Sequence, residues 1–110
     1  MNINKIIFTA LQDVGVPVSF QHYRGQTFPY ITFFTYLEKG EQHADDKEKI
    51  TGYYVQVDIW SKDDYTDLAS TVHQKMLAAG FTKRSYYDFY ETDVGVYHKA
   101  MRFQFNKEVL

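Results

Sequence analysis

The 110-residue sequence contains no cysteine, which excludes disulfides, thiolate catalysis and cysteine-ligated zinc. This absence suits a reducing cytosol or a particle assembled there. No apolar run approaches the length that crosses a membrane. The stretch "MNINKIIFTALQDVGV" also lacks the small-residue cleavage site of a signal peptide. We therefore expect neither a membrane partner nor a leader.

The chain also has little excess charge of either sign. Its 12 Lys and Arg stand against 14 Asp and Glu, for a formal charge of -2 and a sequence pI of about 6.0. Nucleic-acid-binding domains usually carry a strong basic patch. The composition therefore favours a protein partner over nucleic acid.

The residue patterns of common catalytic and metal sites are missing as well. The four histidines stand far apart in the sequence, without metal-ligand spacing: His22, His43, His73 and His98. Asp63, Asp64 and Asp67 cluster where a helix is expected to begin, and capping explains them more simply than acid–base catalysis. No serine lies in a nucleophile elbow, and no glycine-rich phosphate loop is present. We predict a protein without catalytic activity, cofactor or metal.

Aromatic residues are abundant: ten Tyr, nine Phe and one Trp make up 18% of the chain. These residues favour strands, and tyrosine is also enriched in protein interfaces. The composition therefore indicates a β-rich core, with an extensive interface as the sharper alternative.

The first half of the chain predicts one helix and one strong strand. Asn2 can cap a helix over residues 2–13, whose apolar residues repeat at helical spacing. "VSFQHY" is an uncertain short strand, and "YITFFTYLEKG" is a stronger one. Alternation along the stronger strand places Ile31, Phe33, Thr35 and Leu37 on one face. It places Tyr30, Phe34 and Tyr36 on the other. Both faces are apolar, so we expect the strand either to be central in the sheet or to have its outer face in contact with another surface.

The segment "EKGEQHADDKEKITG", residues 38–52, is polar and of mixed charge. It lacks the apolar residues for a core of its own, so we predict an extended hairpin tip or a mobile loop. Its functional interpretation is a projecting arm or a lumen-lining loop. The residues assigned to that role are Glu38, Glu41, Asp45, Asp46, Lys47 and Glu48.

The second half predicts a strand, a helix and a closing hairpin. "YYVQVDIW" alternates with a period of two, after which Ser61 and Asp64 resemble a capping box. Gly80 and Phe81 are placed to end the helix. "TKRSYYDFYE" and "GVYHKAMRFQFN" flank a "TDVG" turn. The order α-β-β-β-α-β-β predicts one α+β domain over residues 1–110. It has two helices on a mainly antiparallel sheet of four to five strands.

Three features together resemble a known family. They are "FPYITFF", then the strand "VDIWSKD" turning into a helix that ends "LAAGF", then the aromatic hairpin. This order resembles the small tail-terminator, or tail-completion, proteins of long-tailed phages and prophages of Gram-positive bacteria. The resemblance covers nearly the whole chain.

The resemblance implies a non-enzymatic virion protein of the tail or neck, assembled in the host bacterial cytoplasm. It implies a ring, usually hexameric, that caps the tail tube and contacts tail-tube and head–tail connector proteins. DNA would pass through it only with non-specific contact.

For such a ring, the residues that we predict to form subunit interfaces are aromatic: Tyr36, Tyr54, Trp60, Tyr86, Phe89 and Tyr90. The alternative is a small binding module whose aromatic hairpin takes single-stranded nucleic acid or a peptide. Lys83 and Arg84 lie next to Tyr86, Tyr87 and Phe89 in that hairpin, as on a base-stacking surface.

Overall fold

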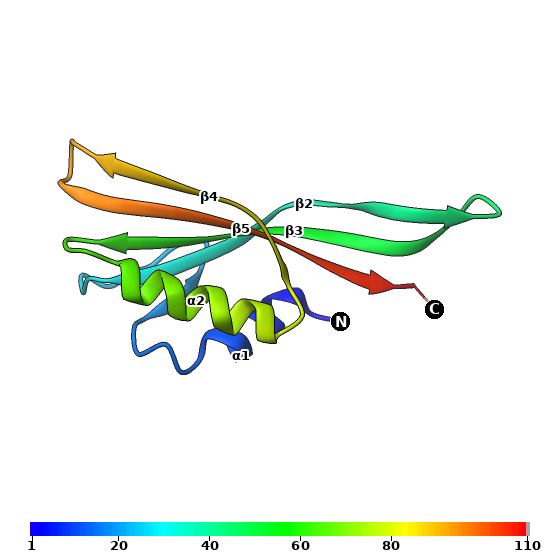
Figure 1. Ribbon diagram of the computed structural model, residues 1–110, viewed down its shortest axis with the longest axis horizontal. Helices are drawn as coiled ribbons and strands as arrows, with labels where there is room; N and C mark the ends of the chain where they lie inside the picture. The colour runs from blue at the N-terminus through cyan, green and yellow to red at the C-terminus, as the bar shows by residue number, and fades with distance from the viewer. Residues whose placement is uncertain (110) are drawn as a thin grey trace.

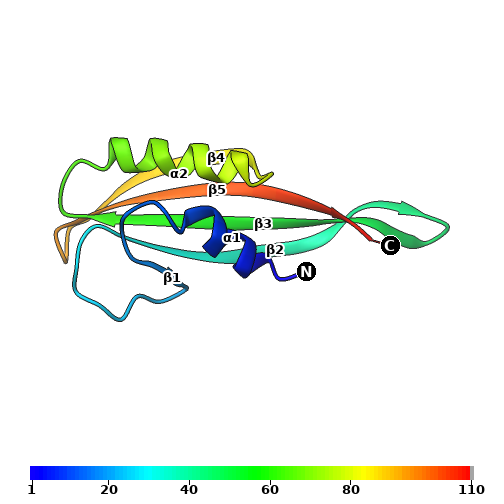
Figure 2. The same cartoon turned by 90° about the horizontal axis from the view of Figure 1, so that it is seen from below.

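Two helices lie against one face of a five-stranded sheet in the computed structural model, which describes residues 1–109 (Figures 1 and 2). In chain order the elements are α1 (Ile3–Leu11), β1 (Val18–Phe20), β2 (Tyr30–Ala44), β3 (Lys47–Ser61), α2 (Thr66–Ala78), β4 (Thr82–Glu91) and β5 (Val96–Glu108). The sheet order is β1-β2-β3-β5-β4, and only β1 and β2 run parallel. The predicted α+β class and element order are confirmed. No helix within residues 1–109 has the length and apolarity needed to span a membrane.

The core lies between the helices and the sheet. Alternate residues of the central strands are fully buried there: Ile31 and Phe33 of β2, Val55, Val57 and Ile59 of β3, and Met101 and Phe103 of β5. Ile7 and Leu11 of α1 and Val72 and Met76 of α2 complete this layer. The alternate residues of the strands and the apolar stripes of the two helices together form one apolar layer, as the sequence predicts.

The helix ends were predicted correctly in two cases out of three. Asn2 caps α1 by accepting a hydrogen bond from the Lys5 amide at 3.3 Å. Gly80, with a φ of +100°, ends α2, and the amide of the buried Phe81 donates to the Met76 carbonyl at 3.1 Å. The Gly80 amide also donates to the Leu77 carbonyl at 3.0 Å. The two bonds form a Schellman motif, which requires the left-handed conformation that glycine adopts freely.

The predicted capping box of Ser61 and Asp64 is wrong. Ser61 is the last residue of β3, and its hydroxyl contacts Asp63. The first helical residue is Thr66, and Asp64 Oδ1 accepts from both its amide and its hydroxyl. The chain needs several residues to turn from the sheet onto its face, so the helix begins later than the pattern indicates.

The strict alternation predicted for β2 is also wrong beyond Thr35. Thr35 pairs with Val55, but Leu37 pairs with Tyr54, so Tyr36 is an extra residue in the ladder. Such a bulge reverses which face the following residues occupy. Leu37, predicted to lie on the core face, is therefore 43% exposed on the opposite side.

Residues 38–52 form the end of the β2–β3 hairpin, the first of the two predicted alternatives. We call this segment the arm. It projects beyond both helices and lengthens the molecule to 52 × 27 × 24 Å (Figures 1 and 2). Asp45 and Asp46 make a two-residue turn, with φ values of 53° and 60°. Both values are left-handed, as a type I′ turn requires.

Replacing Asp45–Asp46 with Asn–Gly is expected to stabilise the protein by about 0.5–1 kcal/mol. Asn and Gly adopt the left-handed region at lower cost than two aspartates, and two adjacent carboxylates are also removed. Urea unfolding at neutral pH measures the change, with Asp93→Asn in the β4–β5 connection as a charge control. A loss of stability in the Asn–Gly variant would contradict the assigned turn.

Candidate interaction surface

No helix or strand among residues 1–109 lies over the sheet face opposite the helices, and we call it the uncovered face (Figures 1 and 2). At its β2 edge, the rings of Tyr23 and Phe28 from the β1–β2 connection pack on Tyr30. Cross-strand partners share a face, so the register shows which side chains lie there. They come from four strands: Tyr30, Thr32, Phe34 and Leu37 of β2, Tyr54, Gln56, Asp58 and Trp60 of β3, His98, Ala100, Arg102 and Gln104 of β5, and Ser85, Tyr87 and Phe89 of β4. The face therefore combines aromatic rings with polar and charged groups.

Aromatic rings line up across the strands at one end of this face. Trp60 stacks on His98 with ring centroids 3.8 Å apart and an interplanar angle of 10°. Phe89 continues the row on the β4 side at 5.5 Å from His98, and Tyr30 continues it on the β2 side at 6.2 Å from Trp60. The indole Nε1 donates to Thr32 Oγ1 at 3.0 Å. The row is fixed in place by stacking and by a hydrogen bond.

A buried carboxylate lies beneath this row. Asp58 is only 4% exposed, and its Oδ1 is 2.7 Å from His98 Nε2 and 2.8 Å from Gln56 Nε2. The other ring nitrogen of His98 lies 3.4 Å from a carboxylate oxygen of Glu91. Gln56 Oε1 accepts from Arg102 Nε at 3.0 Å. This network was not predicted from the sequence, although Asp58, a carboxylate between Val57 and the buried Ile59, was a signal that could have indicated it.

Two arginines lie over tyrosine rings on the same face. The guanidinium of Arg102 is 4.6 Å from the Tyr36 ring centroid, and that of Arg84 is 5.3 Å from the Tyr54 centroid. Arg84 also donates to Gln104 at 2.9 Å. Planar guanidinium groups over aromatic rings keep most of their donors free for a partner's carboxylate or carbonyl. The face is thus suited to a protein partner.

The structure divides the six predicted interface residues between two faces. Tyr36, Tyr54, Trp60 and Phe89 belong to the uncovered face, where Phe89 is 50% exposed but Tyr54 only 7%.

The other two lie on the helix side. Tyr86 packs on Phe103 and bonds His73 at 2.6 Å, whereas Tyr90 is 52% exposed beside Tyr97 at the end of the hairpin. Tyr86 is therefore part of the folded layer, and the exposed aromatic surface gathers on β4.

The arm carries all six residues predicted for it. Glu38, Glu41, Lys47 and Glu48 lie in its strands, and Asp45 and Asp46 form its turn. Glu41 accepts a hydrogen bond from the Tyr54 hydroxyl, and a Cβ at Gly52 would lie 2.5 Å from Glu41 Oε1. Glycine at position 52 thus leaves room for the carboxylate that anchors the arm to the uncovered face.

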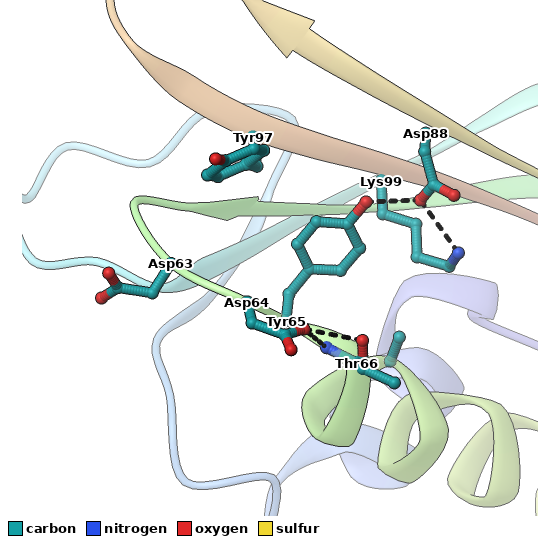
Figure 3. Close-up of a pocket in the computed structure, with 8 residues that line it drawn as sticks. Asp63, Asp64, Tyr65, Thr66, Asp88, Tyr97 and Lys99 are labelled. Atoms are coloured by element: carbon teal, nitrogen blue, oxygen red, sulfur yellow. Dashed lines mark hydrogen bonds and ion pairs between the residues drawn. The ribbon is translucent and has the colours of Figure 1, made fainter.

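A hollow of about 410 Å³ lies on the other side, where α2 begins (Figure 3). Asp63, Asp64, Tyr65, Asp88 and Lys99 are among its lining residues. The Tyr65 hydroxyl donates to Asp88 Oδ1 at 2.5 Å, and Lys99 Nζ donates to the same oxygen at 3.0 Å. These bonds tie the start of α2 to the β4–β5 hairpin. They use the Tyr65 hydroxyl, the Asp88 carboxylate and the Lys99 ammonium group to hold the structure together.

Replacing Tyr65 with phenylalanine is expected to lower the free energy of unfolding by about 1 kcal/mol, because one hydrogen bond to a carboxylate is lost.

Burial and the Asp88 bond raise the pKa of Tyr65 to about 12, and burial raises the pKa of Tyr86 to about 12. Both folded-state pKa values exceed the usual 10, so the stability they contribute is lost as pH rises from about 10 to 12. Tyrosinate absorbance should show one fewer late-titrating group in the Tyr65→Phe variant; an unchanged titration would contradict this.

Comparison with protein-family models and with curated proteins finds no match to this chain.

Proposed function

We propose that the protein is a virion structural protein, a tail terminator that forms a ring at the head–tail junction of a long-tailed phage or prophage. The partners are further copies of the chain, the tail-tube protein and head–tail connector proteins. The ring, with six copies as the family resemblance implies, belongs to the tail or neck of the virion. It assembles in the bacterial cytoplasm.

The observation that carries this proposal is the uncovered face with its aromatic edge. On β4, Tyr87 and Phe89 of this face are 47% and 50% exposed in the single chain, and Tyr90, on the helix side of the same edge strand, is 52% exposed. Aromatic side chains gathered on one side mark protein interaction sites, especially where polar groups surround them. A closed ring needs two different patches on each subunit, and the β4 edge and the projecting arm lie on separate parts of the sheet.

Ring formation is expected when the purified chain is mixed with tail tubes of the same phage, seen as discs at tube ends by negative-stain electron microscopy. Light scattering of the chain alone reports any ring that forms without the tube. Phe89→Ser should reduce the fraction of capped tubes about tenfold, because it removes a half-exposed aromatic contact.

Leu77→Ser is the matched control, since Leu77 is 41% exposed on α2, away from the uncovered face. Tubes that stay uncapped by the natural chain at every concentration would contradict the proposed function.

Duplex DNA is expected to pass such a ring without being held. The arm carries five carboxylates against three lysines, and the whole chain has a net charge of -2, so few phosphates would be neutralised. A gel-shift assay at low salt should show no retarded duplex at micromolar protein. Retardation would count against a DNA channel lined by this arm. Retardation of single-stranded DNA alone would favour the alternative, a module that binds bases through the aromatic hairpin.

A further inference from the structure

Both long edges of the sheet have unpaired backbone groups. β4 is the last strand in the order β1-β2-β3-β5-β4, so one side of Thr82–Glu91 pairs with no described strand. At the other edge β1 pairs with β2 only at Ile31–Phe33. Past Phe33, no strand among residues 1–109 pairs with the outer side of β2. Exposed strand edges of this kind are templates for pairing with another chain.

The directions of the strands make the two edges compatible. β2, β3, β5 and β4 alternate in direction, since each neighbouring pair is antiparallel. If a second copy continues the sheet with its helices on the same side, its β2 lies next to β4 of the first copy and antiparallel to it. The alternation of the sheet then continues unbroken across the subunit boundary.

The chemical order along the two edges also matches in that direction. β4 runs from the basic pair Lys83–Arg84 to the mostly aromatic segment Tyr87–Tyr90, which includes Asp88. The free part of β2 runs from aromatic Phe34 and Tyr36 to the segment Glu38–Glu41, in which two carboxylates outnumber one lysine. Antiparallel pairing places the basic end beside the acidic end and aromatic beside aromatic. Parallel pairing would place the arginine and lysine beside phenylalanine and would lose both matches.

We propose that β4 of one copy pairs with the free edge of β2 in the next copy, with Tyr87 opposite Leu37. Both side chains lie on the uncovered face, as directly opposed residues must. This register puts Lys83 and Arg84 beside Gly40 and Glu41, and Tyr86 beside Glu38. A shift of two residues would instead place Asp88 opposite Glu38, and like charges in that position are unfavourable.

In the proposed pairing, neighbouring copies are offset from each other along the strand direction. Within one copy Tyr87 is level with Thr32, through Ala100 and Asp58. Pairing Tyr87 with Leu37 shifts each copy along the strands by about 16 Å at a rise of roughly 3.3 Å per residue. A ring closes only if tilted strands absorb the shift, as they do in barrels, and otherwise the contact makes an open filament. The inference rests on the proposed ring function for closure, but the edge contact itself is independent of it.

Cysteine cross-linking tests the contact, because the natural chain has no thiol. Tyr87→Cys and Leu37→Cys are combined in one chain and also made separately, and each replaces a side chain that is 47% or 43% exposed. Under mild oxidation the double variant should give a ladder of cross-linked chains. An equal mixture of the single variants should give dimers only, and each single variant alone should stay monomeric. Tyr87→Cys combined with Thr9→Cys on α1 is the matched control, and it should give no ladder.

Three results would overturn the pairing. Rapid dimerisation of Tyr87→Cys alone would mean that β4 pairs with β4 of another copy. A double variant that does not cross-link would mean that these edges stay apart. Arg84→Glu and the remote Lys5→Glu are each added to the double cysteine variant. Equal cross-linking rates for the two would mean that Arg84 does not contribute to the contact, contrary to the proposed charge pairing. We expect Arg84→Glu to be about threefold to tenfold slower.

Electron microscopy of the same samples separates this inference from the proposed function. Capped tail tubes without a cross-linked ladder would leave the terminator function intact and refute the β4–β2 contact. A ladder from open filaments that never bind tail tubes would support the contact and refute the terminator function. Where both proposals hold, the longest closed species in the ladder gives the number of subunits.

Discussion

Replacing Phe33 with alanine is expected to lower the free energy of unfolding by about 3–5 kcal/mol. Phe33 is fully buried near the start of β2, and its ring lies 4.9 Å from that of Phe8 on α1 and 5.8 Å from that of Phe20 on β1. Truncation removes the apolar contacts of a whole ring and leaves a cavity bordered by two other elements. For a domain of this size, that is a large part of the total stability.

The matched comparison is Phe89→Ala. Phe89 is 50% exposed on the edge strand, so its truncation should change the free energy of unfolding by less than about 1 kcal/mol. Urea unfolding followed by far-ultraviolet circular dichroism measures both variants. If assembly proceeds as proposed, the two residues have opposite roles, because Phe33 holds the fold and Phe89 mediates contact between copies. Similar unfolding midpoints for the two variants would contradict the assignment of Phe33 to the core.

The element order followed from the sequence because periodicity is a local property. The buried positions Val55, Val57 and Ile59 alternate strictly, and Val72 and Met76 recur at helical spacing. The cap at Gly80 followed for the same reason, since a Schellman motif is built from residues close together in the chain.

What the sequence pattern missed depends on contacts between distant residues. The bulge at Tyr36 reverses the face of Leu37, and no local signal marks it, because both faces of the strand are apolar. The bond between Asp58 and His98 joins residues on neighbouring strands, which only the pairing register reveals. The surface was thus predicted by residue type, but its arrangement was not.

That arrangement also changes which mutation best tests the interface. Replacing Tyr54 and Trp60 with serine is the experiment that the sequence suggests, since both lie opposite the core face of their strand. Tyr54 is only 7% exposed, and Trp60 stacks on His98 and bonds Thr32. The double variant would therefore destabilise the fold as well as the surface. Phe89 and Tyr87 separate the two effects, because each is about half exposed.

Replacing Asp58 with alanine is expected to lower the free energy of unfolding by about 2–4 kcal/mol. Its carboxylate accepts from Gln56 and pairs with His98 while only 4% exposed, so its removal leaves both partners without their acceptor. Asp58→Asn keeps the side-chain volume and one acceptor oxygen and should cost about half as much. Asp88→Ala is the exposed comparison, since the Asp88 side chain is 62% exposed and its loss should matter less.

Urea unfolding ranks the three variants by their free energy of unfolding. Heteronuclear NMR of the His98 ring reports whether its stacking on Trp60 persists. Asp58→Ala should shift the His98 ring resonances and those of the Trp60 indole together, because the Asp58 carboxylate holds the imidazole ring parallel to the indole ring. Unchanged resonances with unchanged stability would mean that the uncovered face is ordered by stacking alone. The expected shift would indicate that the Asp58 carboxylate helps to order this face in the single chain, so the proposed association would lose less side-chain entropy at this surface.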